Sequence, residues 1–153
     1  MPSPVTSWIV RLLSLGLGGL FVFAGLQKHL SPYEFTEAIL AYELLSPSGA
    51  ALTAAFLPWL EIVAGAVVAL GALLPQWADS RSLAAMGHLR RGALLLLVLL
   101  TALFVVLLLV TMARGLKIAC GCGLFFQRLV GPAALAEDLA LLALAAWLYR
   151  RAR

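Results

Sequence analysis

The stretch Gly92–Ala113 reads GALLLLVLLTALFVVLLLVTMA and contains no charged residue. A helix of about 20 apolar residues is long enough to cross the hydrocarbon core of a bilayer, so this stretch predicts a membrane-spanning helix. Three other runs are nearly as apolar and long enough to span: 8–26, 50–74 and 132–149. Together with 92–113, they predict an all-α, integral-membrane four-helix bundle that forms a single domain over 1–153.

The composition of the whole chain agrees with a membrane protein. Of the 153 residues, 63% are hydrophobic and 12% are charged, whereas a soluble domain is about one-quarter charged. The formal net charge is +4, but no run of Lys and Arg is interleaved with aromatic residues. The common nucleotide-binding, zinc-protease and calcium-binding loop motifs are also missing from the sequence. We therefore expect membrane lipid, and no nucleic acid, as a partner.

A short amphipathic helix is predicted between the first two spans, over about 32–45. Ser31-Pro32-Tyr33-Glu34 has the pattern of a capping box with proline at the first helical position. The apolar residues that follow recur at helical spacing on one face: Phe35, Ala38, Ile39 and Tyr42. Such a pattern is typical of a helix that lies along the membrane interface.

The distribution of Lys and Arg predicts the orientation in the membrane. Four spans place both termini and the loop 75–91 on one side, and the two other loops on the opposite side. The terminal side holds seven of the 11 Lys and Arg residues, namely Arg11, Arg81, Arg90, Arg91, Arg150, Arg151 and Arg153. Because basic residues are enriched on the cytoplasmic side, we predict cytoplasmic termini in a bacterial inner membrane. The loop 114–131 is then extracytoplasmic.

This loop contains the sharpest chemical motif of the chain, Ala119-Cys120-Gly121-Cys122-Gly123. On the oxidising side of a membrane, two cysteines separated by one glycine could form a small, strained disulfide. Strained and exposed disulfides are the ones that exchange with partners. Lys117 and Arg128 flank the motif, and nearby positive charge favours the reactive thiolate. The pattern therefore indicates a redox-active pair.

Two other roles for the cysteine pair remain open. One is a static disulfide that holds the loop. The other is binding of a soft metal such as Cu(I), Hg(II) or Zn(II). His29 is the only histidine predicted on the same side of the membrane. Because a structural zinc site needs four ligands, we expect no complete zinc site within one chain.

Glu61 lies near the middle of the second span, where a charged side chain is costly and usually finds a partner inside the bundle. The end of the first span supplies three polar candidates: Gln27, Lys28 and His29. The neighbouring Trp59 could stack on a quinone-like ring, and quinone is the one cofactor that the sequence suggests. Each residue also has a structural interpretation. Glu61 could be an ion-paired packing residue, Lys28 could reach the lipid head groups, and Trp59 could be a buried or interfacial ring.

The small residues of the first two spans and the acidic pair of the last span have mainly structural interpretations. Small residues line one side of the first two spans and indicate close helix packing: Ser14, Gly18, Gly25, Gly65 and Ala69. Glu137 and Asp138 lie near the start of the last span, where the helix dipole favours negative charge. The alternative for these two residues is pairing with Arg128 or assistance in thiol proton transfer.

Four groups of short motifs follow one another along the chain. They are Phe23-Ala24-Gly25-Leu26-Gln27-Lys28 with Ser31-Pro32 and Phe35, Tyr42-Glu43-Leu44-Leu45-Ser46-Pro47, Leu57-Pro58-Trp59-Leu60-Glu61 with Gly65, and Cys120-Gly121-Cys122-Gly123. In order and spacing, the sequence resembles the MauE/DoxX group of small membrane proteins, and the last motif resembles the MauE branch in particular.

The resemblance implies a four-helix membrane protein linked to redox or disulfide handling outside the cytoplasm. It implies Cys120 and Cys122 as the redox pair, and Lys28 and Glu61 as shared polar positions. In methylamine-utilising bacteria, MauE is associated with maturation of the disulfide-rich small subunit of methylamine dehydrogenase, alongside a thioredoxin-like partner.

We therefore expect a component of a thiol-disulfide oxidoreductase system. Its Cys120/Cys122 loop would exchange electrons with a thioredoxin-like partner during maturation of a redox enzyme. One cysteine pair is not expected to relay electrons from a substrate to quinone unaided, so a second thiol protein would complete the circuit. The alternative is a non-catalytic membrane subunit or assembly factor of a larger redox complex. A third hypothesis is soft-metal binding or transport, with Glu61 as an intramembrane waypoint.

Overall fold

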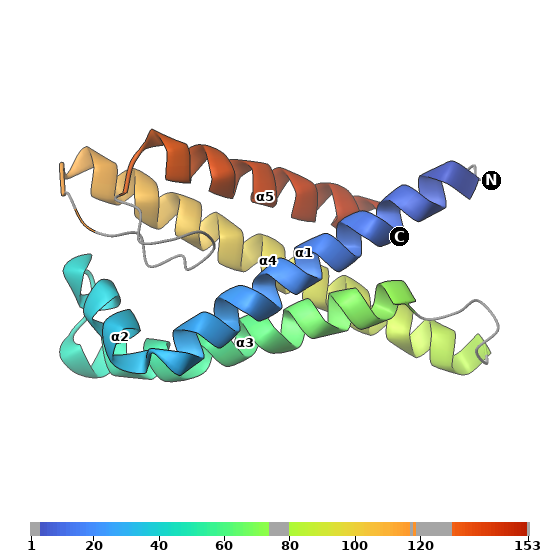
Figure 1. Ribbon diagram of the computed structural model, residues 1–153, viewed down its shortest axis with the longest axis horizontal. Coiled ribbons are helices and arrows are strands. Elements are labelled where there is room, and N and C mark those ends of the chain that lie inside the picture. The colour runs from blue at the N-terminus through green and yellow to red at the C-terminus, as the bar shows by residue number, and fades with distance from the viewer. Residues whose placement is uncertain (1–3, 74–79, 117, 119–129, 153) are drawn as a thin grey trace.

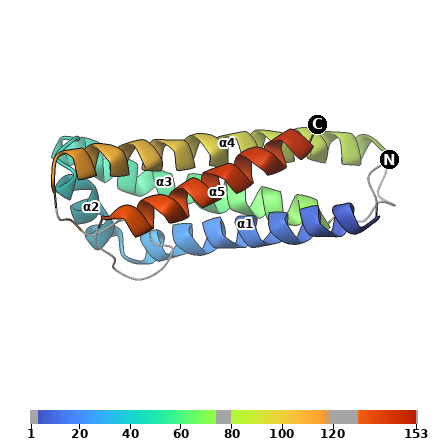
Figure 2. The ribbon, with the colours of Figure 1, turned by 90° about the horizontal axis from the view of Figure 1, so that it is seen from above.

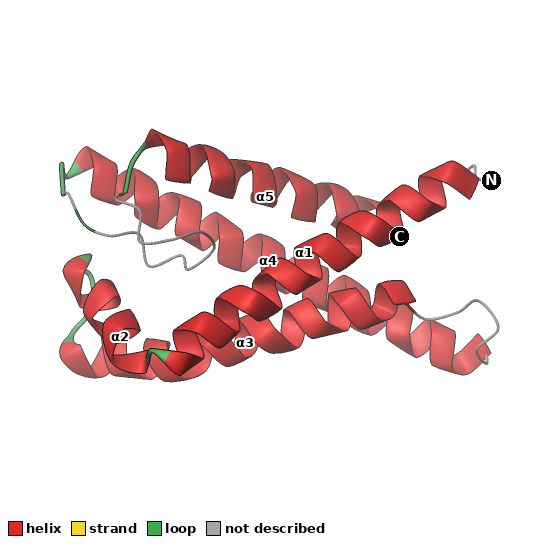
Figure 3. Ribbon diagram, in the orientation of Figure 1, coloured by secondary structure: helices red, strands yellow, loops and turns green. Residues whose placement is uncertain are grey.

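The computed structural model describes residues 4–73, 80–116, 118 and 130–152. Within these residues the chain forms α-helices and no strand (Figure 3): α1 Pro4–Leu30, α2 Pro32–Ala41, α3 Pro47–Leu73, α4 Ser80–Ala113 and α5 Pro132–Arg151. All of these except α2 are long and apolar enough to cross a membrane. The predicted all-α bundle with four membrane spans is therefore confirmed.

The four long helices extend beyond the predicted spans at one or both ends. The clearest case is α4, which begins at Ser80 and carries Arg81, Arg90 and Arg91 in a continuous helix before the uncharged stretch. Arginines without a partner are costly in hydrocarbon, but arginine is a good helix former. The predicted bounds therefore mark the apolar crossing, and the helix itself is longer.

The short helix α2 begins as predicted but ends earlier. Ser31 is its N-cap and Pro32 follows, yet the Ser31 side chain makes no cap hydrogen bond within the described residues. The predicted capping box is wrong in this respect, and the Ser31 carbonyl instead accepts a hydrogen bond from the Phe35 N–H at 3.1 Å. The helix ends at Ala41 and not near 45, because Glu43 has a left-handed backbone conformation with φ of 55°.

The helices form an elongated bundle in which α1 crosses against α3, while α4 runs beside α5 (Figures 1 and 2). The start of α1, the end of α3, the start of α4 and the end of α5 lie together at one end, which we call the terminal end (Figure 1). Helix α2 lies at the opposite end, close to the end of α4 and the start of α5. We call this the α2 end. A chain that crosses a membrane four times in succession places its helix ends at these two ends of the bundle.

Helices α1 and α3 approach closely because glycines remove side chains from their contact. A Cβ atom at Gly18 would lie 2.5 Å from the carbonyl oxygen of Gly65, and one at Gly65 would lie 2.6 Å from that of Gly18. Nearer the α2 end, a Cβ atom at Gly25 would lie 2.7 Å from the carbonyl oxygen of Pro58. The prediction that these glycines permit close packing is confirmed.

Apolar side chains fill the space between the helices and also cover the outside. Phe56, Val63, Leu99 and Val106 are among the large apolar residues that are more than half exposed. Apolar surface of this extent is unfavourable in water and marks contact with lipid or protein. The interior is formed by Leu17, Phe21, Ala64, Val68, Leu94, Leu97, Ala145 and Leu148.

Candidate functional site

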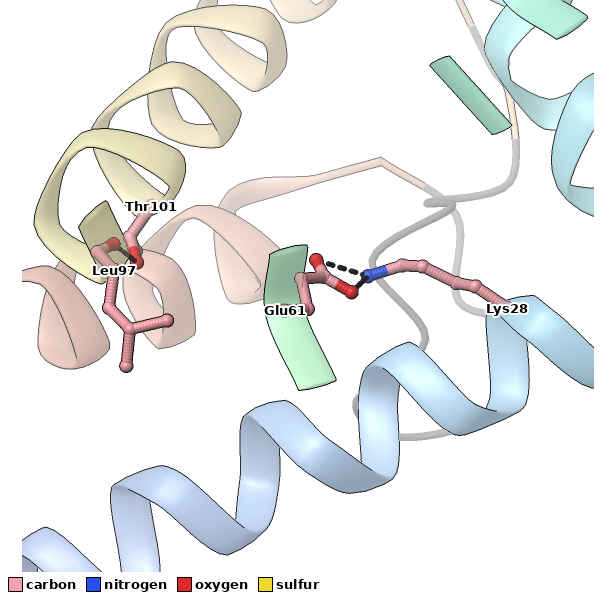
Figure 4. Close-up of polar contacts among 4 residues, drawn as sticks. All are labelled: Lys28, Glu61, Leu97 and Thr101. Atoms are coloured by element: carbon pink, nitrogen blue, oxygen red, sulfur yellow. Dashed lines mark hydrogen bonds and ion pairs between the residues drawn. The ribbon is translucent and has the colours of Figure 1, made fainter. Parts of the chain in front are cut away.

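A buried ion pair between α1 and α3 is the main polar feature of the described interior. The Lys28 Nζ atom lies 2.7 Å from both Oε1 and Oε2 of Glu61 and donates a hydrogen bond to each (Figure 4). The two side chains are only 4% and 1% exposed. In the same view, the buried Thr101 hydroxyl donates to the Leu97 carbonyl of its own helix at 2.7 Å. Thr101 is therefore satisfied without joining the ion pair.

The local sequence explains how the two charges meet. Gly25 lies one turn before Lys28, and a Cβ atom there would lie 3.2 Å from the Glu61 Cβ atom. Pro58 lies one turn before Glu61, and its carbonyl oxygen faces the same glycine. The absence of a side chain at Gly25 thus lets the end of α1 come close enough to α3 for a lysine to reach the middle of the second span.

Two aromatic rings surround the ammonium group. The Lys28 Nζ atom lies 5.6 Å from the centre of the Phe35 ring on α2 and 5.3 Å from that of Phe104 on α4. A cation is attracted to the face of an aromatic ring within about 6 Å. The rings therefore add favourable contacts while they exclude water from the ion pair.

Asp138 on α5 adds a second carboxylate to this region. It is 5% exposed, and its Oδ2 atom is buried without a hydrogen-bond partner among the described residues. Its charge interacts with those of Glu137 and Lys28. From the sequence, Asp138 is predicted mainly as a negative charge that the dipole favours near a helix start. Its spacing from Ala134, Ala145 and Leu148, all buried on α5, is the signal that could have placed it on the inner face.

The arrangement brings one cation and two carboxylates into the bundle. Lys28 and Glu61 neutralise each other, whereas Asp138 has no comparable ion pair in the described part of the chain. An isolated charge inside a membrane is costly, so a proton or a small cation at Asp138 would complete the charge balance. Each of the five helices contributes one side chain to this region: Lys28, Phe35, Glu61, Phe104 and Asp138, in the order α1 to α5.

The remaining predicted polar residues near Glu61 lie outside this interior. Gln27 and His29, which flank Lys28, are exposed. The His29 ring meets the edge of Trp59 with ring centroids 4.9 Å apart, and Trp59 is 51% exposed. His29 and Trp59 thus form an aromatic pair on the outer surface of α1 and α3.

The cysteine motif falls outside the described residues, as do Lys117 and Arg128. The chain on either side of it is described: the Val130 N–H donates to the Ile118 carbonyl oxygen at 2.8 Å. Arg114, just beyond α4, donates to the Tyr42 carbonyl and to Glu43 Oε2, each at 3.0 Å. The two described residues that flank the cysteine motif in the sequence, Ile118 and Val130, are therefore joined by a backbone hydrogen bond.

The described residues contain no group of three His, Cys, Asp or Glu side chains arranged to hold a metal ion. The predicted quinone contact refers to Trp59, which is 51% exposed, and it stays a prediction.

Comparisons with known proteins identify the family. The sequence pattern of the family described as "Methylamine utilisation protein MauE" matches residues 6–151. No curated protein matches the chain significantly, and no solved structure does. The DoxX side of the predicted resemblance is not part of this match and stays a prediction. Because the matched segment covers nearly the whole chain, including all four spans and the cysteine motif, the protein belongs to the MauE family.

Proposed function

We propose that this multi-pass membrane protein takes part in thiol-disulfide exchange through Cys120 and Cys122, with a thioredoxin-like protein outside the cytoplasm as its partner. The observation that carries the proposal is the position of the Cys120-Gly121-Cys122 motif in a MauE-family chain, between two residues that are hydrogen-bonded to each other, Ile118 and Val130. The proposed location is a bacterial inner membrane with cytoplasmic termini.

The α2 end supports this role because it offers a fixed base for the motif. Arg114 connects the end of α4 to the end of α2 through two hydrogen bonds. The Lys28–Glu61 pair, with Phe35 and Phe104 beside it, joins α1, α2, α3 and α4 below that point. A redox pair attached to rigid elements is better positioned for reaction with a partner than one at the tip of a free loop.

The chemistry needs only the two cysteines and the partner. In the oxidised form, a partner thiolate attacks one sulfur of the Cys120–Cys122 disulfide, that bond breaks, and a mixed disulfide forms. The second partner thiolate then displaces the cysteine and closes the partner disulfide. Two electrons pass from the partner to the pair, and the two protons lost by the partner thiols are taken up by Cys120 and Cys122. The reverse sequence reduces a partner disulfide.

The biological role that we propose is maturation of a disulfide-containing redox enzyme. The family description refers to methylamine utilisation, and disulfide formation or correction during enzyme assembly is a step that a membrane-bound thiol pair could serve. A single pair needs another thiol protein to complete its cycle, and this supports a role as one component of a relay.

The test is to trap the exchange intermediate. In Cys120→Ser and Cys122→Ser variants, the remaining cysteine cannot be displaced by its neighbour, so a mixed disulfide with the partner should accumulate in membranes. Non-reducing electrophoresis followed by mass spectrometry detects it, and the double variant is the control. The proposal fails if neither single variant traps a partner and both support normal maturation of the enzyme.

The midpoint potential separates the remaining alternatives. Exchange proteins have potentials of about −120 to −270 mV, whereas structural disulfides are reduced only below about −300 mV. A Cys120/Cys122 pair in the first range supports exchange. A pair in the second range would indicate a static disulfide and a non-catalytic assembly factor. Thiols that never oxidise but retain Cu(I) or Zn(II) after purification would indicate metal binding.

A further inference from the structure

Arg90 lies near the terminal end, and one of its buried hydrogen-bond donors has no acceptor among the described residues. A guanidinium group has five N–H donors. The Arg90 Nη2 atom donates to the Ser14 Oγ atom on α1 at 2.8 Å, whereas the buried Nε atom finds no acceptor among the described residues. A buried donor without an acceptor calls for a partner such as a water molecule, an ion or a ligand.

The structure holds this guanidinium in a defined place. Ser14 is fully buried and gives its own proton to the Val10 carbonyl oxygen at 2.7 Å, so its oxygen acts as an acceptor toward Arg90. On α3, Gly71 leaves room for the arginine stem, because a Cβ atom there would lie 3.0 Å from the Arg90 Cδ atom. Arg90 thus extends from α4 past α3 to α1.

A second arginine adds positive charge at the same place. Arg11 precedes Ser14 by three residues and therefore lies on the same face of α1, the face that Arg90 reaches through its hydrogen bond to Ser14. Neither arginine forms an ion pair in the described ranges. Like charges held close together repel each other, so a bound anion would lower the energy of this cluster.

The sequence offers few carboxylates that could serve as that anion. Six of the seven acidic residues fall within 34–61 and 137–138, in segments that include the α2 end and the middle of the bundle. The seventh, Asp79, precedes the first residue of α4, and Arg90 lies about 15 Å of helix beyond that residue. The six acidic residues in the described part of the chain thus lie away from Arg90.

The position of Arg90 at the end of the uncharged stretch indicates the ligand chemistry. The uncharged stretch Gly92–Ala113 covers about 33 Å of helix, close to the hydrocarbon thickness of about 30 Å. Arg90 comes just before this stretch, at the level of the lipid phosphates. The flat, forked guanidinium group matches the oxygen atoms of a phosphate, and basic pockets between membrane helices bind anionic head groups.

We infer that Arg90 and Arg11 form a binding site for a phosphate group supplied by an anionic membrane lipid, with Ser14 holding Arg90 in place. In this site a phosphate oxygen accepts from a part of the Arg90 guanidinium that Ser14 does not engage, and its negative charge offsets both arginines. The site is at the terminal end, away from the Lys28–Glu61 pair and the cysteine motif. It is therefore independent of the proposed exchange function.

The experiment compares two lipids on the purified full chain in a neutral detergent after removal of bound lipid. Phosphatidylglycerol or phosphatidylcholine with the same acyl chains is titrated in, and bound lipid is counted by native mass spectrometry while the thermal midpoint is recorded. We expect phosphatidylglycerol to bind more tightly and to raise the midpoint. Arg90→Gln should weaken this binding by about tenfold or more, the usual loss for a hydrogen bond to a charged group.

Two further variants make the result specific. Arg11→Gln tests the site even if Arg90→Gln does not fold, and it should also weaken binding. Arg151→Gln removes the same charge near the same end, from a guanidinium that lies over the Trp147 ring, and should bind phosphatidylglycerol as the wild type does.

The source of the phosphate is tested with inorganic phosphate in lipid-free detergent. A rise in the thermal midpoint that is lost in Arg90→Gln, without any preference between the lipids, would keep the phosphate site and make free phosphate its ligand. Equal binding of both lipids with no response to phosphate would overturn the inference. So would an equal loss of binding in Arg151→Gln and Arg90→Gln.

Discussion

Removal of one partner from a buried ion pair leaves the other charge in surroundings that cannot solvate it. The Lys28 and Glu61 side chains are almost fully buried, so each depends on the other. The chain also contains an exposed ion pair, in which Arg114 Nη2 and Glu43 Oε2 lie 3.0 Å apart and remain in contact with solvent. Buried and exposed pairs of the same type can therefore be compared within one protein.

We predict that Lys28→Met lowers the free energy of unfolding by about 3–5 kcal/mol, because it leaves the Glu61 carboxylate unpaired. The double variant Lys28→Met/Glu61→Leu should recover most of this loss, since both charges are then gone. Reversible unfolding in mixed micelles measures the free energies. The exposed pair provides the control: Arg114→Met should change the free energy of unfolding by only about 0–1 kcal/mol.

The double variant also separates stability from function. If the losses from Lys28→Met and Glu61→Leu simply add, the two side chains do not stabilise each other, and the prediction is wrong. If the double variant is stable but no longer forms the mixed disulfide in a Cys122→Ser background, the ion pair has a role in exchange beyond holding the helices. A stable double variant that still traps the partner assigns the pair a structural role.

At the scale of helices, the contact between α1 and α3 depends on backbone atoms that come unusually close. Gly18 and Gly65 each face the carbonyl oxygen of the other. These oxygens are fixed by helical hydrogen bonds and cannot rotate away as a flexible side chain would. An added methyl group must therefore move one helix relative to the other.

We predict that Gly18→Ala destabilises the protein by about 1–3 kcal/mol, the usual cost of overpacking. Gly16 is the matched control, because it lies in the same helix and a Cβ atom there would have nothing within 4 Å. Gly16→Ala should be neutral or should stabilise the protein by up to about 1 kcal/mol through helix propensity. Unfolding in micelles measures both, and equal effects of the two substitutions would show that the contact does not limit stability.

At the scale of the whole molecule, the excess of basic residues at the terminal end predicts its side of the membrane. Seven of the 11 Lys and Arg residues belong to that side in the four-span arrangement, and such residues remain in the cytoplasm during insertion. The α2 end then faces the extracytoplasmic space, where a disulfide can persist.

We predict opposite labelling of two cysteines introduced into a Cys120→Ser/Cys122→Ser background. Ser48 is exposed at the start of α3, at the α2 end, whereas Ala152 directly follows α5 at the terminal end. Ser48→Cys in intact cells should react with a thiol reagent that cannot cross the membrane. Ala152→Cys should react only after the membrane is permeabilised. The reverse pattern would contradict the predicted orientation.

The sequence alone determined the number and nature of the spans. In lipid, backbone groups must be hydrogen-bonded within their own segment, so long apolar runs such as Gly92–Ala113 can cross only as helices. The sequence also indicated the close contact of α1 with α3, because Gly18, Gly25 and Gly65 are the positions where a missing side chain allows backbones to meet. It named Lys28 as one of three candidate partners of Glu61.

Only the tertiary structure decided which side chains meet. The long helices are apolar on nearly all faces, so their hydropathy does not define how each is rotated about its axis. Packing against neighbours sets that rotation: it turns Lys28 inward while Gln27 and His29 stay exposed, and it places Asp138 on the buried side of α5. The contact of Arg90 with Ser14 likewise joins helices that are distant in sequence. In a membrane protein, the apolar composition of a segment determines that it forms a spanning helix. The contacts between helices determine which polar side chains meet.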